Sequence, residues 1–252
     1  MPSELGIIIP EKVGLGYLSS GHVFLAKRAI TSTGKVAKTS GAKWARIRAW
    51  SGGGGGGGAG RTVTAGNASQ GWAGQSGTYI EIWLNVEGLT EYNCTIGLGG
   101  KGGAVSQVNA GNPGLDGGVT SITGILSCPG GKGGQQGILG TTNNTGIAVV
   151  GTELPTATAG TILDRSVADI GAPGAQVGTG PNQSLASRGG SAPGGIGSVG
   201  GQAGRQISDG NGTGGNGNGY AAGGGGGASI TNSDGFAGGD ATNGVIFIEE
   251  FA

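Results

Sequence analysis

Uninterrupted glycine limits what this chain can fold into more than any other feature. Residues 52–58 are seven consecutive glycines and residues 223–227 are five more, within a total of 65 Gly in 252 residues. That content is about three times the usual share. Because glycine loses more conformational entropy on folding than any other residue, such a chain must stay disordered or recover the loss through backbone hydrogen bonds.

Two common explanations of a high glycine content fit poorly. Collagen needs a strict Gly-X-Y period and abundant proline, whereas this chain has no sustained period and only 8 Pro. Disordered chains usually carry a strong net charge, whereas this chain has 14 basic and 14 acidic residues. Composition alone leaves disorder open, but several apolar, strand-like segments argue against it.

Four segments have the pattern of β-strands. Residues 78–86 give the clearest pattern, since Ile80, Ile82 and Leu84 occupy alternate positions and form one apolar face. Residues 42–50, 92–98 and the C-terminal 244–251 are also predicted strands. We expect a small sheet with a conventional hydrophobic core, in which the C-terminal strand pairs with residues 78–86.

The rest of the chain alternates between glycine-rich runs and segments rich in Ser, Thr and Asn. Glycine-rich segments favour the left-handed polyproline II helix, which has three residues per turn and no internal hydrogen bonds. Several such helices can satisfy one another's N–H and C=O groups if the contact positions lack side chains. We therefore predict a slab with a backbone interior and polar loops at its ends, the longest at 135–170. GGKGG occurs twice, at 99–103 and 130–134, which is a weak internal repeat.

The net charge of zero conceals an asymmetry. Residues 1–61 carry nine Lys/Arg and two Glu (9 − 2 = +7), and the remainder carries five Lys/Arg and twelve acids (5 − 12 = −7). A basic N-terminal part could bind nucleic acid, but its cations are spread out and the usual groove-reading motifs are absent. Electrostatic docking onto another protein explains the asymmetry equally well.

No catalytic, metal or cofactor site is predicted. GGGAGRT at 56–62 is only faintly similar to a phosphate-binding loop, because Arg61 stands where that loop needs Lys. His22 is the only histidine, and nothing near it suggests the nucleophile elbow of a Ser-His-Asp triad. A metal site would have to combine His22 with Cys94 and Cys128, which lack the spacing of zinc ligands. The sequence therefore predicts a protein that is not an enzyme.

Nothing in the sequence predicts secretion or membrane insertion. The short apolar run at the start is broken by Pro10, and no stretch approaches the roughly 20 apolar residues of a membrane span. Two cysteines give no disulfide framework. We expect synthesis in the cytoplasm and no insertion into a membrane.

Several segments resemble one known family. The opening MPSELGIIIPEKVGLGYLSSGHVF, together with WARIRAWSGGGGGGG, YNCTIGLGGKGG, ILDRSVADIG, QSLASRGGSAPGG and the C-terminal GVIFIEEF, is similar to the receptor-binding adhesins at the distal tip of the long tail fibre of T-even-like bacteriophages. The similarity runs through the whole chain in order. It implies a virion protein at the distal tip of that fibre.

The resemblance implies a mostly irregular and β fold with two domains. Residues 1–120 would be a small β-containing domain that attaches to the distal subunit of the trimeric fibre. Residues 121–252 would be a sandwich of packed polyglycine II helices with variable loops. Those loops would bind an outer-membrane barrel protein of a Gram-negative host, in some members with help from lipopolysaccharide, and the family gives no reason to expect a nucleic-acid partner.

Transferring this organisation to the sequence predicts two groups of site residues. Isolated apolar residues in polar loops suit receptor binding because a few anchors dominate affinity, although each could equally pack on the slab. The residues predicted for the receptor-binding loops are Val105, Val108, Asn109, Gln135, Gln136, Ile138, Leu139, Asn143, Asn144, Gln206, Ile207, Asp209, Asn211, Tyr220, Ile230, Asn232, Asp234 and Phe236. Those predicted for fibre attachment are Ile7, Ile8, Ile9, Leu15, Tyr17, Trp44 and Trp50, with core packing as the alternative for each Trp.

Two other functions stay open at this point. One is a fibre-assembly chaperone, which related phages encode at the equivalent genomic position and which leaves the virion but lacks the glycine-rich part. The other is a structural glycine-rich protein, such as an ice-binding or wall protein. A flat ice-binding face needs a regular row of small residues, which the long irregular segment and the basic aromatic N-terminal part make a poor fit.

Overall fold

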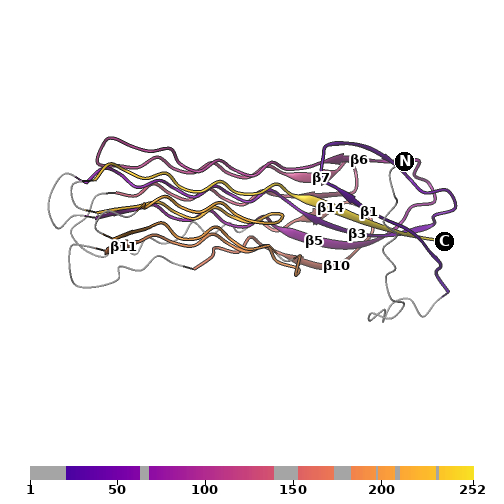
Figure 1. Cartoon of the computed structure of the whole chain (residues 1–252). Helices are drawn as coiled ribbons and strands as arrows, with labels where there is room; N and C mark the ends of the chain where they lie inside the picture. The colour runs from indigo at the N-terminus through magenta and orange to yellow at the C-terminus, as the bar shows by residue number, and fades with distance from the viewer. Residues whose placement is uncertain are drawn as a thin grey trace, which may run out of the picture.

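The computed structural model describes residues 21–62, 68–138, 153–172, 183–196, 198–207, 211–230 and 233–252, with the backbone alone at 183, 184, 206 and 207. These residues form an elongated molecule, with β-sheets at one end and long wavy runs extending away from them (Figure 1). We call the two ends the strand end and the tip. Every regular element in the described ranges is a β-strand, which confirms the predicted mostly β and irregular fold class.

The first sheet has five antiparallel strands in the order β1-β14-β3-β5-β10. They are β1 (Phe24–Ile30), β14 (Val245–Phe251), β3 (Trp44–Trp50), β5 (Tyr79–Asn85) and β10 (Thr161–Ser166). The strands predicted at 42–50, 78–86 and 244–251 are thus confirmed. The predicted pairing of the last two is wrong, because Ile47 of β3 lies opposite both Ile248 and Ile82. The inward side chains of β3, which include Ala45 and Ala49, are completely buried, so this strand suits the centre of the sheet.

A second five-stranded sheet packs against the first. It has the order β2-β6-β7-β8-β9, and β6 confirms the strand predicted within 92–98. The hydrophobic core lies between the two sheets and includes Ile47, Ile82, Ile122 and Ile248, each at most 1% exposed. The strands of the second sheet are β2 (Gly34–Ala37), β6 (Glu91–Thr95), β7 (Thr120–Ile122), β8 (Leu126–Cys128) and β9 (Thr156–Ala157).

The prediction of one long loop over 135–170 is wrong. Residues up to Gly137 continue a glycine-rich run, and β9 and β10 belong to the sheets at the strand end. β10 is an edge strand whose register against β5 shifts between Ile162 and Asp164. Because that shift interrupts the alternation of inward and outward residues, the sequence pattern does not predict this strand.

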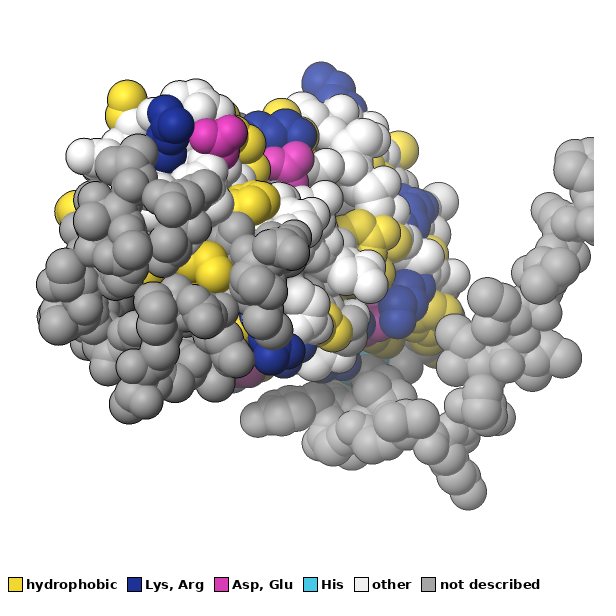
Figure 2. Space-filling model, turned by 60° about the vertical axis from the view of Figure 1, so that its left-hand side comes forward, with side chains coloured by type: hydrophobic (Ala, Val, Ile, Leu, Met, Phe, Trp, Pro, Cys, Tyr) yellow, Lys and Arg dark blue, Asp and Glu magenta, His cyan; other side chains and the backbone are white. Residues whose placement is uncertain are grey.

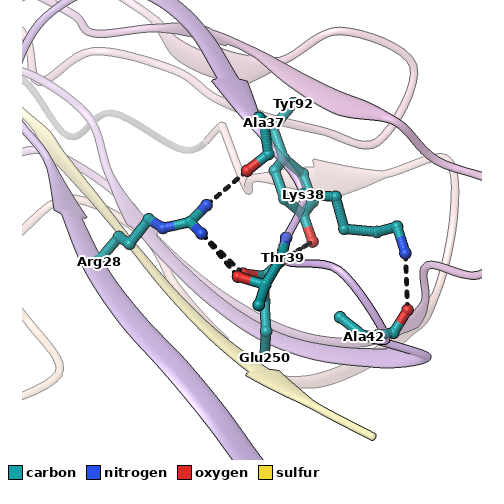
Figure 3. A network of polar contacts seen from close by, with 7 residues as sticks. All are labelled: Arg28, Ala37, Lys38, Thr39, Ala42, Tyr92 and Glu250. Carbon is teal, nitrogen blue, oxygen red and sulfur yellow. Dashed lines mark hydrogen bonds and ion pairs between the residues drawn. The ribbon is translucent and has the colours of Figure 1, made fainter.

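A buried carboxylate links the two sheets (Figure 3). Glu250 on β14 accepts hydrogen bonds from the Tyr92 hydroxyl (3.0 Å) and from both the backbone N–H (3.0 Å) and the hydroxyl of Thr39. The guanidinium of Arg28 lies 3.6 Å from the same carboxylate and donates to the Ala37 carbonyl over 2.5 Å. These partners compensate for the loss of water around a side chain that is completely buried. Burial, followed by the neighbouring Glu250 carboxylate, raises the pKa of the Tyr92 phenol.

Ten glycine-rich runs within the described ranges extend between the strand end and the tip, with their hydrogen bonds directed sideways to neighbouring runs. Run 52–60 leaves β3 towards the tip and run 71–77 returns to β5. Outgoing and returning runs continue in this way as far as β14. The ten runs are 52–60, 71–77, 97–104, 111–118, 130–137, 186–192, 198–204, 211–217, 222–227 and 235–244.

Run 52–60 is surrounded by other runs. Its N–H groups donate in rotation to three neighbours, so that each neighbour accepts from every third residue, and its carbonyl oxygens accept in the same rotation from three more (3 + 3 = 6). A Cβ atom on Gly54 or Gly55 would lie 2.1 Å from a backbone carbonyl oxygen, which explains why this run is nearly pure glycine. The accepting runs are 111–118, 235–244 and 71–77, and the donating runs are 97–104, 130–137 and 222–227.

Run 222–227 forms a second centre of the same kind. It donates to runs 186–192, 52–60 and 211–217, and it accepts from 71–77, 198–204 and 235–244, which again gives six neighbours (3 + 3 = 6). The two longest pure glycine stretches of the sequence are therefore the two runs that have no free side.

The outer runs carry side chains at the positions that face solvent. In run 97–104 the exposed residues are Leu98, Lys101 and Ala104, three positions apart. Lys101 forms an ion pair with Asp240 (2.7 Å), and the N–H of Gly102 donates to the same carboxylate (2.8 Å).

The second GGKGG segment makes the same arrangement. Lys132 pairs with Asp116 at 3.0 Å, and the N–H of Gly133 donates to that carboxylate over 2.8 Å. The repeated motif thus marks outer runs in which an acidic side chain from the neighbouring run accepts an outward N–H group.

The division into two domains at residue 120 stays a prediction. Hydrogen bonds cross this position both in the first sheet and between the runs: β3 pairs with β14, and Gly134 and Gly224 donate to Gly55 and Gly54.

Candidate functional site

The connections between outgoing and returning runs meet at the tip. Two short antiparallel pairs lie there: β4 (Ala68–Gln70) with β13 (Ala228–Ile230), and β11 (Gln183–Leu185) with β12 (Arg205–Ile207). In Figure 1 the label of β11 marks this end, far from the labelled strands of the two sheets. Segments distant in the sequence are thereby brought into one surface.

Backbone hydrogen bonds hold neighbouring tip segments together. The N–H of Arg61 donates to the carbonyl of Val108 over 2.8 Å. Ala110 forms an isolated antiparallel β-bridge with Ile138, and Thr62 forms another with Ser233. The connection between the two runs at 97–118 is therefore fixed on both sides by other parts of the chain.

The connection at 105–110 presents exposed aliphatic side chains from a closed turn. The Ser106 hydroxyl donates to the carbonyl of Ala110 (2.5 Å), which closes the turn internally. Val105 and Val108 are 52% and 67% exposed, and Ile138 across the backbone bridge is 58% exposed. Figure 2, turned so that the tip comes forward, shows single hydrophobic side chains of the described residues, in yellow, that do not merge into one continuous patch. Such isolated apolar groups on a fixed backbone are suited to contacting a protein surface.

Arg61 belongs to this surface, although it is not among the site residues predicted from the sequence. It forms an ion pair with Asp234 at 3.5 Å, and both side chains are largely exposed. The sequence could have indicated this part of the tip, because a polar segment separates runs 52–60 and 71–77. Such a segment predicts a connection between two runs, as residues 105–110 do.

The remaining predicted loop residues divide by burial. Asn109 and Asn211 are exposed at the tip, whereas Phe236 is half-buried and Ile230 is only 3% exposed. The Ile230 side chain packs inward from β13, so this residue packs on the slab and is not exposed for receptor binding. Gln135 and Gln136 are exposed on the last turn of run 130–137, and Gln206 and Ile207 lie in β12, where the backbone alone is described.

Tyr220 lies at the opposite end of the molecule from the tip. It belongs to the turn between runs 211–217 and 222–227, next to Ala221, which packs with Trp50 and Tyr79 at the strand end. Residue composition along the chain does not distinguish turns at the tip from turns at the strand end, because both are short segments between glycine-rich runs.

The two tryptophans predicted for fibre attachment differ in exposure. Trp50 is completely buried, and its indole N–H donates to the carbonyl of Pro193 over 2.6 Å. Trp50 is therefore a core residue, which was the alternative to fibre attachment for this tryptophan. Trp44 is half-buried and stacks on Trp83, with the ring centroids 6.0 Å apart.

Ten predicted site residues lie outside the described residues and stay predictions: Leu139, Asn143, Asn144, Asp209, Asn232, Ile7, Ile8, Ile9, Leu15 and Tyr17.

Few features of the described residues suggest small-molecule chemistry. Among these residues no group of three His, Cys, Asp or Glu side chains could hold a metal ion. An open depression at the corner between β1 and β2 is lined by residues 28–36 and lies at the strand end, away from the tip. In the described part of the chain no helix is long and apolar enough to cross a membrane.

A scan against protein-family models finds no match to this chain, and a search of curated proteins finds no similar sequence.

Proposed function

We propose that this chain is the receptor-binding adhesin at the distal tip of the long tail fibre of a T-even-like bacteriophage. On this proposal the tip binds an outer-membrane protein of a Gram-negative host. The strand end is held by the distal subunit of the trimeric fibre. The observation that supports it most is the surface at the tip, where Val105, Val108 and Ile138 are exposed on segments joined by backbone hydrogen bonds.

We also propose that the glycine-rich runs are packed polyglycine II helices. Their sideways hydrogen bonds rotate among neighbours with a period of three residues, which is the period of the polyproline II helix. Eight residues of such a helix span roughly 25 Å. The proposed slab therefore separates the receptor-binding loops from the attachment domain by a fixed distance.

The architecture supports a binding role because loops on a rigid scaffold concentrate binding residues. The interior of the slab uses backbone groups of glycine, so loop sequences can change without altering a side-chain core. This separation suits a protein whose binding specificity must change while its attachment stays the same.

The alternatives have less support. A fibre-assembly chaperone would lack the glycine-rich runs that join the strand end of this chain to its tip. An ice-binding face needs a regular row of small residues, but the outward row Leu98, Lys101 and Ala104 mixes apolar, charged and small side chains. The proposal includes no catalysis and no cofactor.

The experiment that tests this function uses the purified full-length chain bound to its fibre subunit. We expect it to adsorb to cells of the host and to capture one outer-membrane protein from detergent extracts of that strain. Deletion of the host gene for that protein should abolish adsorption. Retention on the fibre without adsorption to any strain of a Gram-negative panel would contradict the adhesin function and favour an assembly factor.

A further inference from the structure

Four asparagines of the chain are followed directly by glycine, which is the sequence most prone to spontaneous deamidation. In that reaction the backbone nitrogen of the glycine attacks the side-chain carbonyl carbon of the asparagine, and glycine permits the approach because it has no Cβ atom. All four asparagines are exposed, so exposure does not distinguish them. The four pairs are Asn211-Gly212, Asn216-Gly217, Asn218-Gly219 and Asn243-Gly244.

The pair Asn216-Gly217 is fixed by two hydrogen bonds to one residue of a neighbouring run. The N–H of Gly217 donates to the carbonyl of Asp240 over 2.8 Å. The side-chain oxygen of Asn216 accepts from the N–H of the same Asp240, also over 2.8 Å. The nitrogen that would attack is therefore engaged, and the side chain is directed to another run.

The pair Asn243-Gly244 is held in the same way. The N–H of Gly244 donates to the carbonyl of Gly97 over 2.8 Å. The side-chain oxygen of Asn243 accepts from the N–H of Gly99 over 2.8 Å. Both of these asparagines thus use their side chains to satisfy the outward N–H groups of the slab.

The glycine of Asn211-Gly212 lacks such a bond. The N–H of Gly215 donates to the carbonyl of Gln202 over 2.8 Å, and the period of three would next pair Gly212 with Arg205. Arg205 instead belongs to β12, where it pairs with another strand. Within the described ranges the N–H of Gly212 therefore has no acceptor.

The side chain of Asn211 is also positioned for the reaction. Its oxygen accepts from the backbone N–H of Thr213 over 2.9 Å. This local turn folds the side chain forward over the intervening Gly212, so that the amide carbon lies beside the glycine nitrogen. The Thr213 N–H would also stabilise the negative charge that develops on the side-chain oxygen when that carbon is attacked.

The pair Asn218-Gly219 lies in the exposed turn at the strand end. The N–H of Asn218 donates to the carbonyl of Val199 over 2.9 Å, but this bond does not hold the following residue. Gly219 is exposed, has a φ of 83°, and its N–H has no acceptor in the part of the chain that the structure describes.

We infer that Asn211 and Asn218 are sites of spontaneous deamidation in the folded chain. Asn216 and Asn243 are protected by the hydrogen bonds of the slab. At a reactive site the glycine nitrogen loses its proton to hydroxide and bonds to the side-chain carbon, and the bond from that carbon to the amide nitrogen breaks to release ammonia. Water then opens the resulting succinimide at either carbonyl, which gives aspartate or isoaspartate.

The two sites differ in what their modification changes. Asn211 lies at the tip, so deamidation adds a negative charge to the proposed receptor-binding surface, and isoaspartate also lengthens the backbone there by one carbon. This consequence rests on the proposed function, whereas the reaction itself does not. Asn218 would gain the same charge at the strand end, away from that surface.

Peptide mapping by mass spectrometry tests the sites directly. The folded full-length chain is stored in warm buffer at pH 8 and then digested, and isoaspartyl methyltransferase identifies isoaspartate. The control is the tryptic peptide 206–252 stored in the same buffer. It contains all four pairs, because Arg205 is the last Lys or Arg of the sequence. In this unfolded peptide all four asparagines should react at similar rates.

In the folded chain the four rates should separate into two classes. Asn216 and Asn243 should react roughly tenfold or more slowly than in the peptide, because a hydrogen bond of the slab must first open. Asn211 and Asn218 should react within about threefold of their rates in the peptide, because no such opening is needed. Equal rates at all four sites, or protection of Asn211 as strong as that of Asn216, would overturn the inference.

Receptor binding tests the consequence at the tip separately. Asn211→Asp should weaken binding to the captured outer-membrane protein by about threefold or more, because an added charge loses water in the interface. The matched control Asn218→Asp should leave binding unchanged. Equal binding by the two variants would overturn the consequence. Failure of the unsubstituted chain to bind any outer-membrane protein would instead contradict the proposed function and leave the deamidation rates as a separate result.

Discussion

Gly224 donates its backbone N–H to the carbonyl oxygen of Gly54 over 3.0 Å, and this bond joins the two runs that each have six neighbours. Each of these runs is enclosed by other backbone segments, and each is nearly pure glycine. A packed interior normally requires apolar side chains of matching shape. Here the requirement is the absence of side chains.

A methyl group in the centre of the slab should be strongly destabilising. Gly55→Ala would place its Cβ 2.1 Å from the carbonyl oxygen of Lys101, a backbone atom that cannot rotate away. We expect a loss of about 3 kcal/mol or more in the free energy of unfolding, as for severe overpacking. Urea denaturation measures it. The matched control is Gly88→Ala, where a Cβ would meet nothing within 4 Å, and equal stability of the two variants would refute the enclosed-run account.

The sequence predicts the chemistry of the slab better than its connectivity. The glycine runs at 52–58 and 223–227 indicate a backbone interior, because no other arrangement recovers the entropy of ordering so much glycine. The pairing of runs cannot be read in the same way, since one glycine run is chemically the same as another. Side chains give information only on the outer runs, where Lys101 and Lys132 mark the positions that face solvent.

Strand prediction has a similar limit. The alternation in 78–86 correctly predicts β5, but the choice of neighbour depends on a register that the alternation leaves open. The C-terminal strand could have paired with any strand that has an apolar inner face, and β14 instead lies between β1 and β3.

Removing the charge of Glu250 should destabilise the strand end. In Glu250→Gln, one amide N–H₂ group would face the hydrogen-bond donors of Thr39 or Tyr92 that now point at the carboxylate. We expect a loss of about 2–3 kcal/mol, because a buried charged acceptor is replaced by a poorly matched group. Thermal or urea unfolding measures this loss. Glu91→Gln, which removes the exposed ion pair with Lys35, is the control and should cost less than about 1 kcal/mol. Similar losses in the two variants would contradict a structural role for the buried network.

Stability should decrease at alkaline pH because two tyrosines are protected from ionisation. Burial is the largest cause that raises the pKa of Tyr79 and of Tyr92, and neighbouring Glu81 and Glu250 add to it. A raised folded-state pKa means that the stabilisation is fully present below the unfolded value of about 10 and is lost as the pH rises above it. Above pH 10 each tyrosine should contribute a slope of up to about 1.4 kcal/mol per pH unit to the free energy of unfolding. Urea titrations between pH 8 and 11 measure the slope. It should be shallower in Tyr92→Phe, and an identical slope in that variant would contradict the assignment.

Both cysteines should be unreactive in the folded protein. Cys94 and Cys128 lie buried on β6 and β8, with β7 between them, and neither forms a disulfide. Burial raises the pKa of the Cys94 thiol to about 11, and it raises the pKa of Cys128 further. Because the thiolate is the reactive form, Ellman's reagent at pH 8 should label neither residue in native buffer and both in urea. Rapid stoichiometric labelling of either thiol without denaturant would show that the strand end opens easily.

The tip could be predicted only in part from the sequence. Polar breaks between glycine runs predict Val105, Val108 and Ile138 as exposed loop residues, which matches their burial. The same rule includes Tyr220, which lies at the strand end, and Ile230, which is buried. A polar segment between two glycine-rich runs shows that the chain turns. Whether it turns at the tip or at the strand end depends on how many runs precede it in the chain. The sequence does not give this number, because β9 and β10 lie among the glycine-rich runs and are not predicted by the sequence pattern.

We propose that receptor specificity resides in the tip, and a matched pair of substitutions can separate the tip from the side of the slab. Val108 at the tip is 67% exposed and Leu98 on the side of the slab is 69% exposed, so Val108→Asp and Leu98→Asp change surface charge equally at similar exposure. Binding of the fibre-bound adhesin to the outer-membrane protein it captures should weaken about tenfold or more in Val108→Asp and stay unchanged in Leu98→Asp. Loss of binding in Leu98→Asp, with Val108→Asp binding normally, would place the receptor on the side of the slab and rule out a receptor-binding tip.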